Sequence, residues 1–276
     1  MRSFSIIFFL LYSIILSGQT NYAKEADYKA FLKTKTLVVL ENKLLSSYNE
    51  TIRKVVEQIW TITPYEFITD KEFEIKKHNK NYSFLLLSDA TLEVKGSMMQ
   101  YNILNLILGR KVASLNDMPD LGSFPICYSD QDKDDFLYKI GGMLQFMQFF
   151  VRYNMNHTNT SFINLIKNID SYIGNKEIWL LKTEVDAEID TKEKIKNYYQ
   201  GIVKLATTEE IEDAIAYKKS NIVFLHKIGN KIRGNICWKV LINIENGEPL
   251  YFDQYIIDKK HIDAFTAEDF TKLKYK

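Results

Sequence analysis

A histidine and an aspartate in the last quarter of the chain are the strongest candidates for chemistry. His226 directly follows the apolar run 222–225, and Asp253 lies in a later apolar segment that could fold back beside it. Ligands of α/β units commonly lie where strands end. The two residues are predicted to contribute to a binding site, with a hydrolase site completed by the loop 117–128 as the alternative. Because a structural hydrogen bond explains a single histidine more simply, neither residue is assigned a catalytic role.

Basic residues and glycines alternate in the turn that follows this histidine. Lys227, Lys231 and Arg233 surround Gly229 and Gly234. The backbone N–H groups of such a turn, together with its positive charges, can hold an anion. A solvated hairpin connection is the alternative interpretation. The three cations are therefore candidate binding residues.

An acidic cluster has the alternating carboxylates with which a calcium-binding loop begins. Residues 130–134 read Asp-Gln-Asp-Lys-Asp, but the sixth position is Asp135 and the twelfth is Gly141. A calcium loop requires glycine and a bidentate glutamate at those two positions. An acidic cap on a following helix explains the cluster better. The four histidines also lack metal-ligand spacing, so neither a metal nor another cofactor is predicted.

Two cysteines, Cys127 and Cys237, could form a disulfide if the chain is exported. Oxidation is permitted in extracytoplasmic compartments. A bridge would close a long loop, which the chain-entropy model values at roughly 4 to 5 kcal/mol. The spacing specifies no pairing and Cys237 lies in a strand pattern, so two separate buried thiols are favoured.

The first residues have the composition of a secretory signal peptide. Arg2 precedes the apolar run 4–16, and small residues end the segment at Gly18. The run is shorter than the roughly 20 apolar residues that a membrane-spanning helix needs, so cleavage after Gly18 is predicted. No later segment is apolar enough to span a membrane. The chain is therefore expected to be exported to the periplasm or secreted.

The charge balance argues against one broad class of partner. Lysine and arginine together number 36, and aspartate and glutamate number 35, which gives a formal net charge of +1. Nucleic-acid binding needs a basic excess on one face, so nucleic acid is not an expected partner. An envelope protein or a small ligand is the expected partner instead.

An internal repeat organises the elements that would position these residues. Tyr65–Phe73 aligns with Val203–Ile211, and Ser83–Leu87 aligns with Asn221–Leu225, both at a shift of 138 residues without a gap. Self-similarity at a fixed period indicates a repeated structural unit. Each half of the chain is therefore expected to contain the same series of strands and helices.

The predicted fold class is α/β (α+β), with two tandem β-α-β-α-β-β units that form small mixed sheets. Short continuous apolar runs suit buried strands, and Thr69 and Thr207 precede acidic residues as helix N-caps do. The predicted strands are 36–40, 65–68, 83–87 and 99–108 in the first unit, and 177–181, 202–206, 222–225, 236–244 and 250–257 in the second. The predicted helices are 44–60, 70–77, 191–199, 208–219 and 264–273.

The order of elements also predicts how the strands pair. Each unit should have two crossovers between parallel strands, a final antiparallel pair, and helices on one face. Asn246-Gly247 predicts a two-residue hairpin turn. The element order resembles the amino-terminal lobe of the periplasmic Tol-system protein TolB, and the chain more broadly resembles exported bacterial proteins. Because no motif residues are shared, the resemblance implies no function.

Four segments are predicted: a signal peptide at 1–18, a first unit at 26–110, a loop and helical linker at 111–175, and a second unit at 176–276. The irregular stretch 109–131, which overlaps the start of the linker, is the first candidate for a pocket wall. A broad apolar stripe predicts one long helix over 132–155, clamped between the lobes or docked on a partner. Gly141-Gly142 within it predicts a close contact with a neighbouring helix.

The sequence contains no nucleophile elbow, phosphate-binding loop, dinucleotide fingerprint or zinc-protease motif. We therefore predict a non-enzymatic binding or interaction protein of the cell envelope, which would recognise its ligand in the groove between the lobes. A hydrolase-type enzyme with its site at that junction is one alternative. A structural assembly subunit is another.

Overall fold

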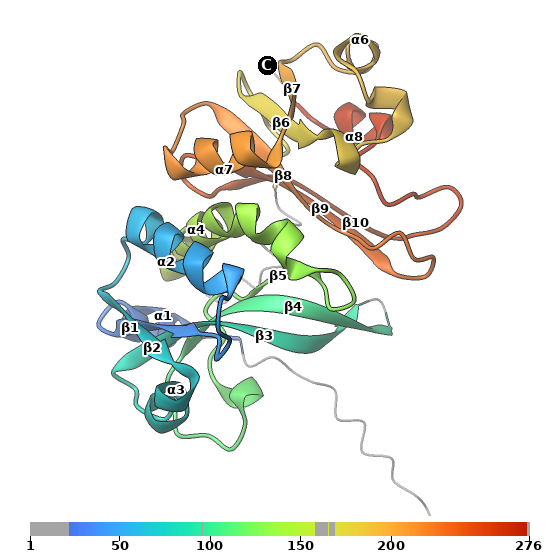
Figure 1. Cartoon of the computed structure of the whole chain (residues 1–276). Helices are drawn as coiled ribbons and strands as arrows, with labels where there is room; N and C mark the ends of the chain where they lie inside the picture. Colours follow the sequence, from blue (N-terminus) through green and yellow to red (C-terminus); the bar gives the residue numbers. More distant parts are fainter. Residues whose placement is uncertain (1–21, 95, 158–164, 166–168, 275–276) are drawn as a thin grey trace, which may run out of the picture.

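The computed structural model of the chain describes residues 22–94, 96–157, 165 and 169–274. The predicted signal peptide lies outside these residues. The fold is a mixed α+β structure with two five-stranded sheets (Figure 1). No helix in this part of the chain is long and apolar enough to cross a bilayer.

The first sheet has the strand order β2-β1-β3-β4-β5. β1 pairs in parallel with β2 and β3, and β4 pairs antiparallel with β3 and β5. The helix α1 precedes this sheet, and a 3-10 turn, η1, precedes its last strand. The bounds are α1 Glu25–Phe31, β1 Lys35–Leu40, α2 Ser47–Ile59, β2 Tyr65–Thr69, α3 Asp70–Lys76, β3 Tyr82–Val94, β4 Ser97–Leu108, η1 Leu115–Asp117 and β5 Phe124–Tyr128.

The second sheet has the equivalent order, β7-β6-β8-β9-β10, with parallel and antiparallel pairs at the same places. The predicted pairing is therefore confirmed in both sheets. The bounds are β6 Glu177–Leu181, η3 Lys182–Glu184, η4 Ala187–Ile189, α6 Lys192–Ile195, β7 Val203–Ala206, α7 Thr208–Ala216, β8 Ile222–Ile228, β9 Ile236–Asn243, β10 Pro249–Ile256 and α8 Ala267–Thr271.

The prediction that helices cover one face of each sheet is wrong. In the first sheet, Ile52 of α2 and Phe73 of α3 belong to separate core clusters on opposite faces. The strand order gives the reason: β2 and β3 lie on opposite sides of β1, so successive crossovers run in opposite directions. Crossovers of one hand then place their helices on opposite faces.

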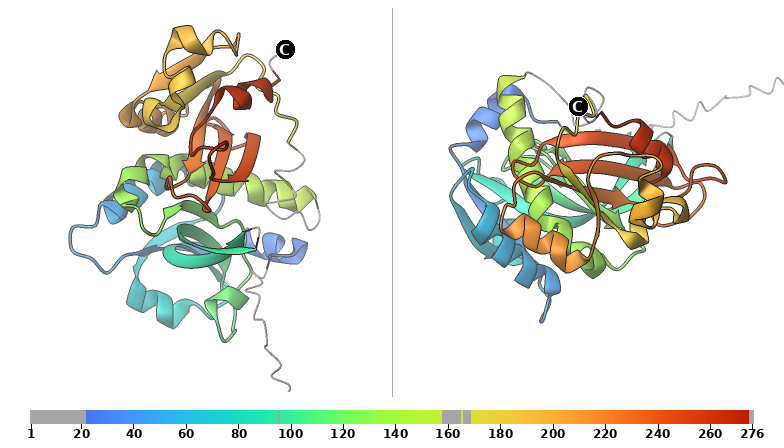
Figure 2. Two further views of the ribbon diagram at one scale, coloured as in Figure 1. Left: turned by 90° about the vertical axis from the view of Figure 1, so that its right-hand side faces the viewer. Right: turned by 90° about the horizontal axis from the view of Figure 1, so that it is seen from above.

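A layer of helices lies between the two sheets (Figures 1 and 2). It contains α2 from the first unit, α7 from the second, and α4, which spans Ile140–Asn156. The first unit thus contributes the helix of its first crossover, whereas the second contributes the helix of its second. The two units therefore face each other through different surfaces.

The long helix predicted over 132–155 is replaced by two elements. Lys133–Lys139 forms a 3-10 segment, η2, and α4 then runs for 17 residues. Asp132 accepts a hydrogen bond from the Asp134 backbone N–H, so the acidic cluster caps η2. Lys133 and Lys139 form ion pairs with Glu41 and Glu184, and these contacts hold η2 between the two units.

Gly141 and Gly142 allow the close contact that the sequence predicts, and the nearest neighbour of each comes from the second unit. A Cβ at Gly141 would lie 2.6 Å from Ile215 Cγ2, and one at Gly142 would lie 2.3 Å from Phe224 Cζ. Ile215 belongs to α7 and Phe224 to β8. Any side chain larger than hydrogen would separate α4 from the second sheet.

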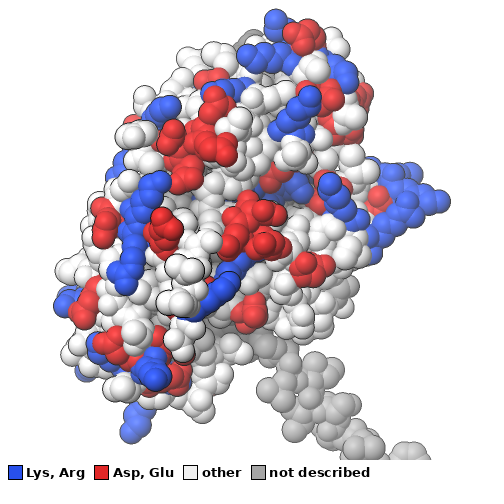
Figure 3. Space-filling view, in the orientation of Figure 1, with Lys and Arg blue, Asp and Glu red and all other residues white. Residues whose placement is uncertain are grey.

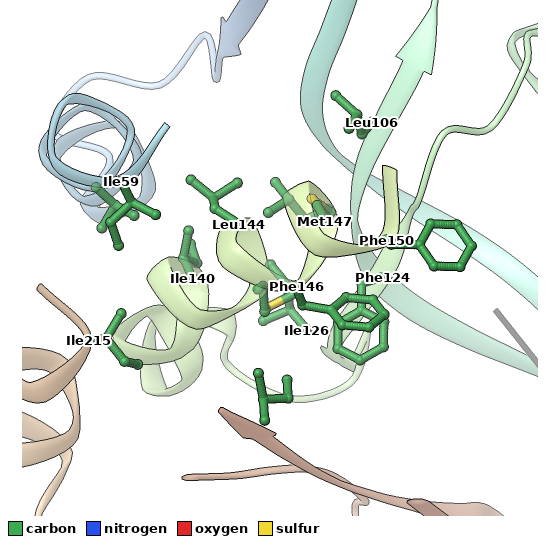
Figure 4. Close-up of a cluster of buried hydrophobic side chains, with 14 of the residues drawn as sticks. Ile59, Leu106, Phe124, Ile126, Ile140, Leu144, Phe146, Met147, Phe150 and Ile215 are labelled. Carbon is green, nitrogen blue, oxygen red and sulfur yellow. The ribbon is translucent and has the colours of Figure 1, made fainter. Parts of the chain in front are cut away.

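One continuous apolar core joins the two units. Figure 4 shows α4 side chains packed against α2, β4, β5 and α7. The same cluster extends to Trp179, Phe224 and Val240 in the second sheet. A second cluster joins Tyr101 and Tyr128 to Trp238. The junction between the lobes is therefore packed rather than open where a groove was expected.

Two loop predictions are also corrected. Residues 124–128 form β5 inside the stretch expected to be irregular, and all five are buried. β9 and β10 are joined by residues 244–248 rather than by the two-residue turn predicted at Asn246-Gly247. Gly247 N–H donates to the Asn243 carbonyl oxygen, and Asn243 N–H donates to the Glu248 carbonyl oxygen. The first strand of the hairpin therefore ends at Asn243, one residue before the predicted end.

Candidate functional site

His226 lies in the core between the sheets and is fully buried on β8. Its Nε2 is 3.0 Å from the carbonyl oxygen of Pro125. Because a carbonyl only accepts, Nε2 carries the proton and donates. Nδ1 has no hydrogen-bond partner among the described residues. Burial, with a smaller contribution from the Lys139 charge, lowers the pKa of His226 to about 3.

Asp253 does not approach His226. In the sheet register, His226 pairs with Val240 and Val240 with Phe252, whereas Asp253 pairs with Lys239. Neighbouring positions along a strand point to opposite faces, so Asp253 lies on the outer face of the second sheet. The structure therefore does not bring together the histidine and the carboxylate that the sequence analysis considered as a pair.

The outer face carries a chain of alternating charges. Lys239, with 1% of its side chain exposed, lies 2.5 Å from Asp269 and 3.5 Å from Asp253. Lys272 is 3.2 Å from Asp253 and 3.0 Å from Glu268. Asp269 also accepts from the hydroxyl of Tyr251, whose pKa burial and this carboxylate both raise. A cavity of about 170 Å³ lies beside these charged side chains.

Every charge in this group lies within 4 Å of an opposite charge, so these residues hold the structure together rather than attract a ligand. Asp269 accepts from the backbone N–H and the hydroxyl of Thr266, which begins α8. The Lys239–Asp269 pair thereby fixes α8 on the sheet. Lys227, one of the predicted anion-binding residues, also forms a buried ion pair: its ammonium nitrogen lies 2.5 Å from Asp263, and its side chain is 8% exposed.

The two cysteines are separate buried thiols, as the sequence analysis favoured. Burial is the largest cause that raises the pKa of Cys127 to about 11 and that of Cys237 to about 12. Asn102 Nδ2 lies 3.6 Å from the Cys127 sulfur. The described residues contain no group of His, Cys, Asp and Glu suited to a metal ion.

The other predicted cations, Lys231 and Arg233, are exposed in the β8–β9 turn. Gly234 N–H bonds the Ile257 carbonyl oxygen at 2.9 Å, and Ile257 N–H bonds the Asn235 carbonyl oxygen at 2.7 Å. These bonds place the turn beside the segment that follows β10. Lys259 and Lys260 in that segment are also exposed. Figure 3 shows lysine and arginine gathered on this projecting part of the molecule.

Three isoleucines lie in or next to these two segments, with Ile256 at the end of β10. Ile232 is 50% exposed, Ile256 is 41% exposed and Ile262 is 38% exposed. No ion pair to the four cations is found among the described residues. We call this surface the basic tip, and it consists of Lys231, Ile232, Arg233, Ile256, Lys259, Lys260 and Ile262.

Two of the four cations in the basic tip, Lys231 and Arg233, were predicted from the sequence. Lys259 and Lys260 were missed because they follow a strand rather than lie in a glycine-containing turn. The adjacent Asp258-Lys259-Lys260-His261 run was the available signal. Asp258 accepts from the backbone N–H groups of Lys260 and His261, which lowers the pKa of this aspartate to about 2 and tightens the turn.

Comparison with protein-family models gave no match. Searches of curated protein sequences and of solved structures also gave none.

Proposed function

We propose that the chain is an exported, non-enzymatic interaction protein of the cell envelope, and that the basic tip attaches it to an anionic membrane surface. The observation that carries the proposal is the combination of four cations, which have no ion-pair partner among the described residues, with three partly exposed isoleucines on one projection. Cations supply attraction to anionic headgroups, and apolar side chains gain free energy by entering the acyl boundary.

The magnitude fits reversible attachment. Each lysine or arginine near an anionic lipid surface contributes about 1 kcal/mol, and the effect is screened within a Debye length. Four such residues, less the repulsion of the ionised Asp258 beside them, would contribute about 3 kcal/mol at low salt on this scale. Burial of the exposed parts of the isoleucines adds a smaller term that salt does not weaken.

The basic tip is also held in a defined shape. Lys231 adopts a φ of 61°, in the left-handed region that a lysine rarely occupies. Its backbone N–H donates to Asp263 Oδ2 at 3.0 Å, and the same carboxylate binds Lys227. A preformed surface loses less conformational entropy on binding than a mobile loop does.

The hydrolase alternative has less support. His226 is buried and makes its bond to a backbone carbonyl, while Asp253 lies on the other face of the sheet. The structural-subunit alternative would be favoured by one contiguous apolar surface. Large exposed apolar residues are instead distributed over several elements, as Ile75 on α3 and Tyr217 after α7 illustrate.

Vesicle flotation tests the proposal. The purified chain should float with phosphatidylcholine vesicles that contain phosphatidylglycerol, but not with phosphatidylcholine alone, and added salt should weaken binding. A Lys259→Glu/Lys260→Glu variant should bind on the order of a hundredfold more weakly at low salt, because it reverses two attractive charges. Ile232→Ser should lower the binding that persists at high salt.

A matched control reverses two exposed lysines outside the basic tip. Lys71→Glu/Lys196→Glu makes the same change in net charge and should leave vesicle binding nearly unchanged. Equal loss in both double variants would mean that only net charge matters. That result, or no flotation with anionic vesicles, would refute the membrane-attachment proposal and redirect the search to an acidic protein.

A further inference from the structure

A cavity lies in the first unit, away from the basic tip. It has a volume of about 540 Å³. Three segments form it: the end of α1 with the turn to β1, the turn after α3, and the residues that follow β4. Pockets of about 300 to 1,000 Å³ commonly hold small molecules.

Positive charge dominates the wall of this cavity. Lys33, Lys80, Arg110 and Lys111 line it, with Asp27 as its one carboxylate. Asp27 is already engaged, because it binds the Arg110 guanidinium group and the Lys24 backbone N–H. In the part of the chain described here, the three lysines have no acidic partner.

Backbone contacts fix the wall. Gly109 N–H bonds the Tyr82 carbonyl oxygen at 2.9 Å, and Arg110 N–H bonds the Lys77 carbonyl oxygen at 3.2 Å. A Cβ at Gly109 would lie 2.3 Å from the Asn79 carbonyl oxygen, so only glycine permits this approach. The segment that carries Arg110 and Lys111 is therefore fixed against the segment that carries Lys80.

A histidine adds an oriented polar group. His78 Nδ1 lies 3.2 Å from the Arg110 carbonyl oxygen. Since that oxygen only accepts, Nδ1 must donate. Ala30 and Leu108 supply an apolar part of the lining. The cavity thus combines several cations with a small apolar surface.

We propose that this cavity binds a small organic anion with at least two negative charges, carried by phosphate or carboxylate oxygens. Three uncompensated lysines around one cavity attract a multivalent anion, and the apolar part accepts a compact carbon skeleton. The site is independent of membrane attachment, because none of its lining residues belongs to the basic tip.

The lysines have one other role to consider. Lys33 follows α1, and Lys80 follows α3, and cations near a helix C-terminus stabilise its carbonyl groups. That role needs no ligand and does not explain Lys111, which follows a strand. Removing these lysines would then change stability slightly and anion affinity not at all.

Isothermal titration calorimetry at low ionic strength provides the test, with pyrophosphate and citrate as probes. At least one probe should bind saturably to one site. Tighter binding of pyrophosphate would identify a phosphate ligand, and tighter binding of citrate a polycarboxylate. Lys33→Gln/Lys111→Gln should weaken that binding at least tenfold, because it removes two of the three lysine charges around the cavity. Both side chains are exposed, so their replacement should leave the fold intact.

Two control variants make the result specific. Lys71→Gln/Lys196→Gln removes two exposed lysines elsewhere and should bind the probe as the native chain does. Lys259→Glu/Lys260→Glu impairs the basic tip and should also retain probe binding, which separates this site from the proposed membrane contact. Absence of saturable binding to both probes, or unchanged affinity in the Lys33/Lys111 variant, would overturn the proposal.

Discussion

The phenolic oxygen of Tyr128 lies 2.8 Å from both the backbone nitrogen and the backbone oxygen of Ile236. Tyr128 belongs to the first sheet and Ile236 to the second. Its hydroxyl donates to the Ile236 carbonyl and accepts from the Ile236 N–H group. Tyr101 also donates to this hydroxyl at 3.1 Å, and Trp238 Nε1 bonds Tyr101 at 3.3 Å. A buried polar network thus joins the two sheets.

Tyr128→Phe should destabilise the chain by about 2 kcal/mol, because it removes a partner from buried backbone groups that water cannot reach. Urea unfolding would measure the change as a lower midpoint with a similar slope. Tyr48→Phe is the control, since the Tyr48 hydroxyl is buried with no hydrogen-bond partner in the described structure. It should cost little or stabilise the fold. Similar losses in both variants would contradict the assigned role of Tyr128.

The buried histidine should make the chain sensitive to acid. Burial and Lys139 lower the pKa of His226 from an ordinary value of 6.5 to about 3, so the folded chain keeps it neutral. The unfolded chain binds this proton below about pH 6.5, and acid therefore favours unfolding. The loss should begin near pH 6.5, reach about 2 kcal/mol at pH 5, and level off near pH 3.

Unfolding free energies at pH 7 and pH 5 would isolate this contribution. His226→Leu should reduce the difference between the two pH values by about 2 kcal/mol, even if its absolute stability is lower. His78→Gln replaces an exposed histidine and should keep the native difference. If His226→Leu retained the full pH dependence, carboxylates rather than this histidine would be its source.

Local sequence signals predicted much of the fold. Thr69 and Glu72 form a reciprocal capping box, and so do Thr207 and Glu210. These caps fix where α3 and α7 begin, and short apolar runs fix the parallel strands. Both signals act over a few residues and need no knowledge of the partner element.

Features that depend on tertiary contacts were not predictable in the same way. β5 contains Pro125, which argues against a central strand, but an edge strand tolerates it. The opposite placement of His226 and Asp253 follows from strand register. The basic tip also depends on the backbone bonds between Gly234 and Ile257, which bring together two segments that are distant in the sequence. Element order alone does not specify these contacts.

Both cysteines should be unreactive in the folded chain. Burial raises the pKa of Cys127 to about 11 and that of Cys237 to about 12, so neither thiolate is populated near pH 8. A chromogenic disulfide reagent should detect no thiol in the native chain and both thiols after unfolding without reductant. Detection of neither thiol until a reductant is added would instead reveal a disulfide and contradict the separate-thiol geometry.

The buried Lys239–Asp269 pair should be far more important for stability than an exposed pair. Lys239→Met should cost about 3 to 5 kcal/mol, because Asp269 would remain buried without its nearest cation. Lys29→Met removes the lysine of the exposed Glu25–Lys29 pair and should cost at most about 1 kcal/mol. Urea unfolding of both variants provides the comparison. Equal costs would mean that Tyr251 and Thr266 satisfy Asp269 without Lys239, and that the charge chain does not anchor α8.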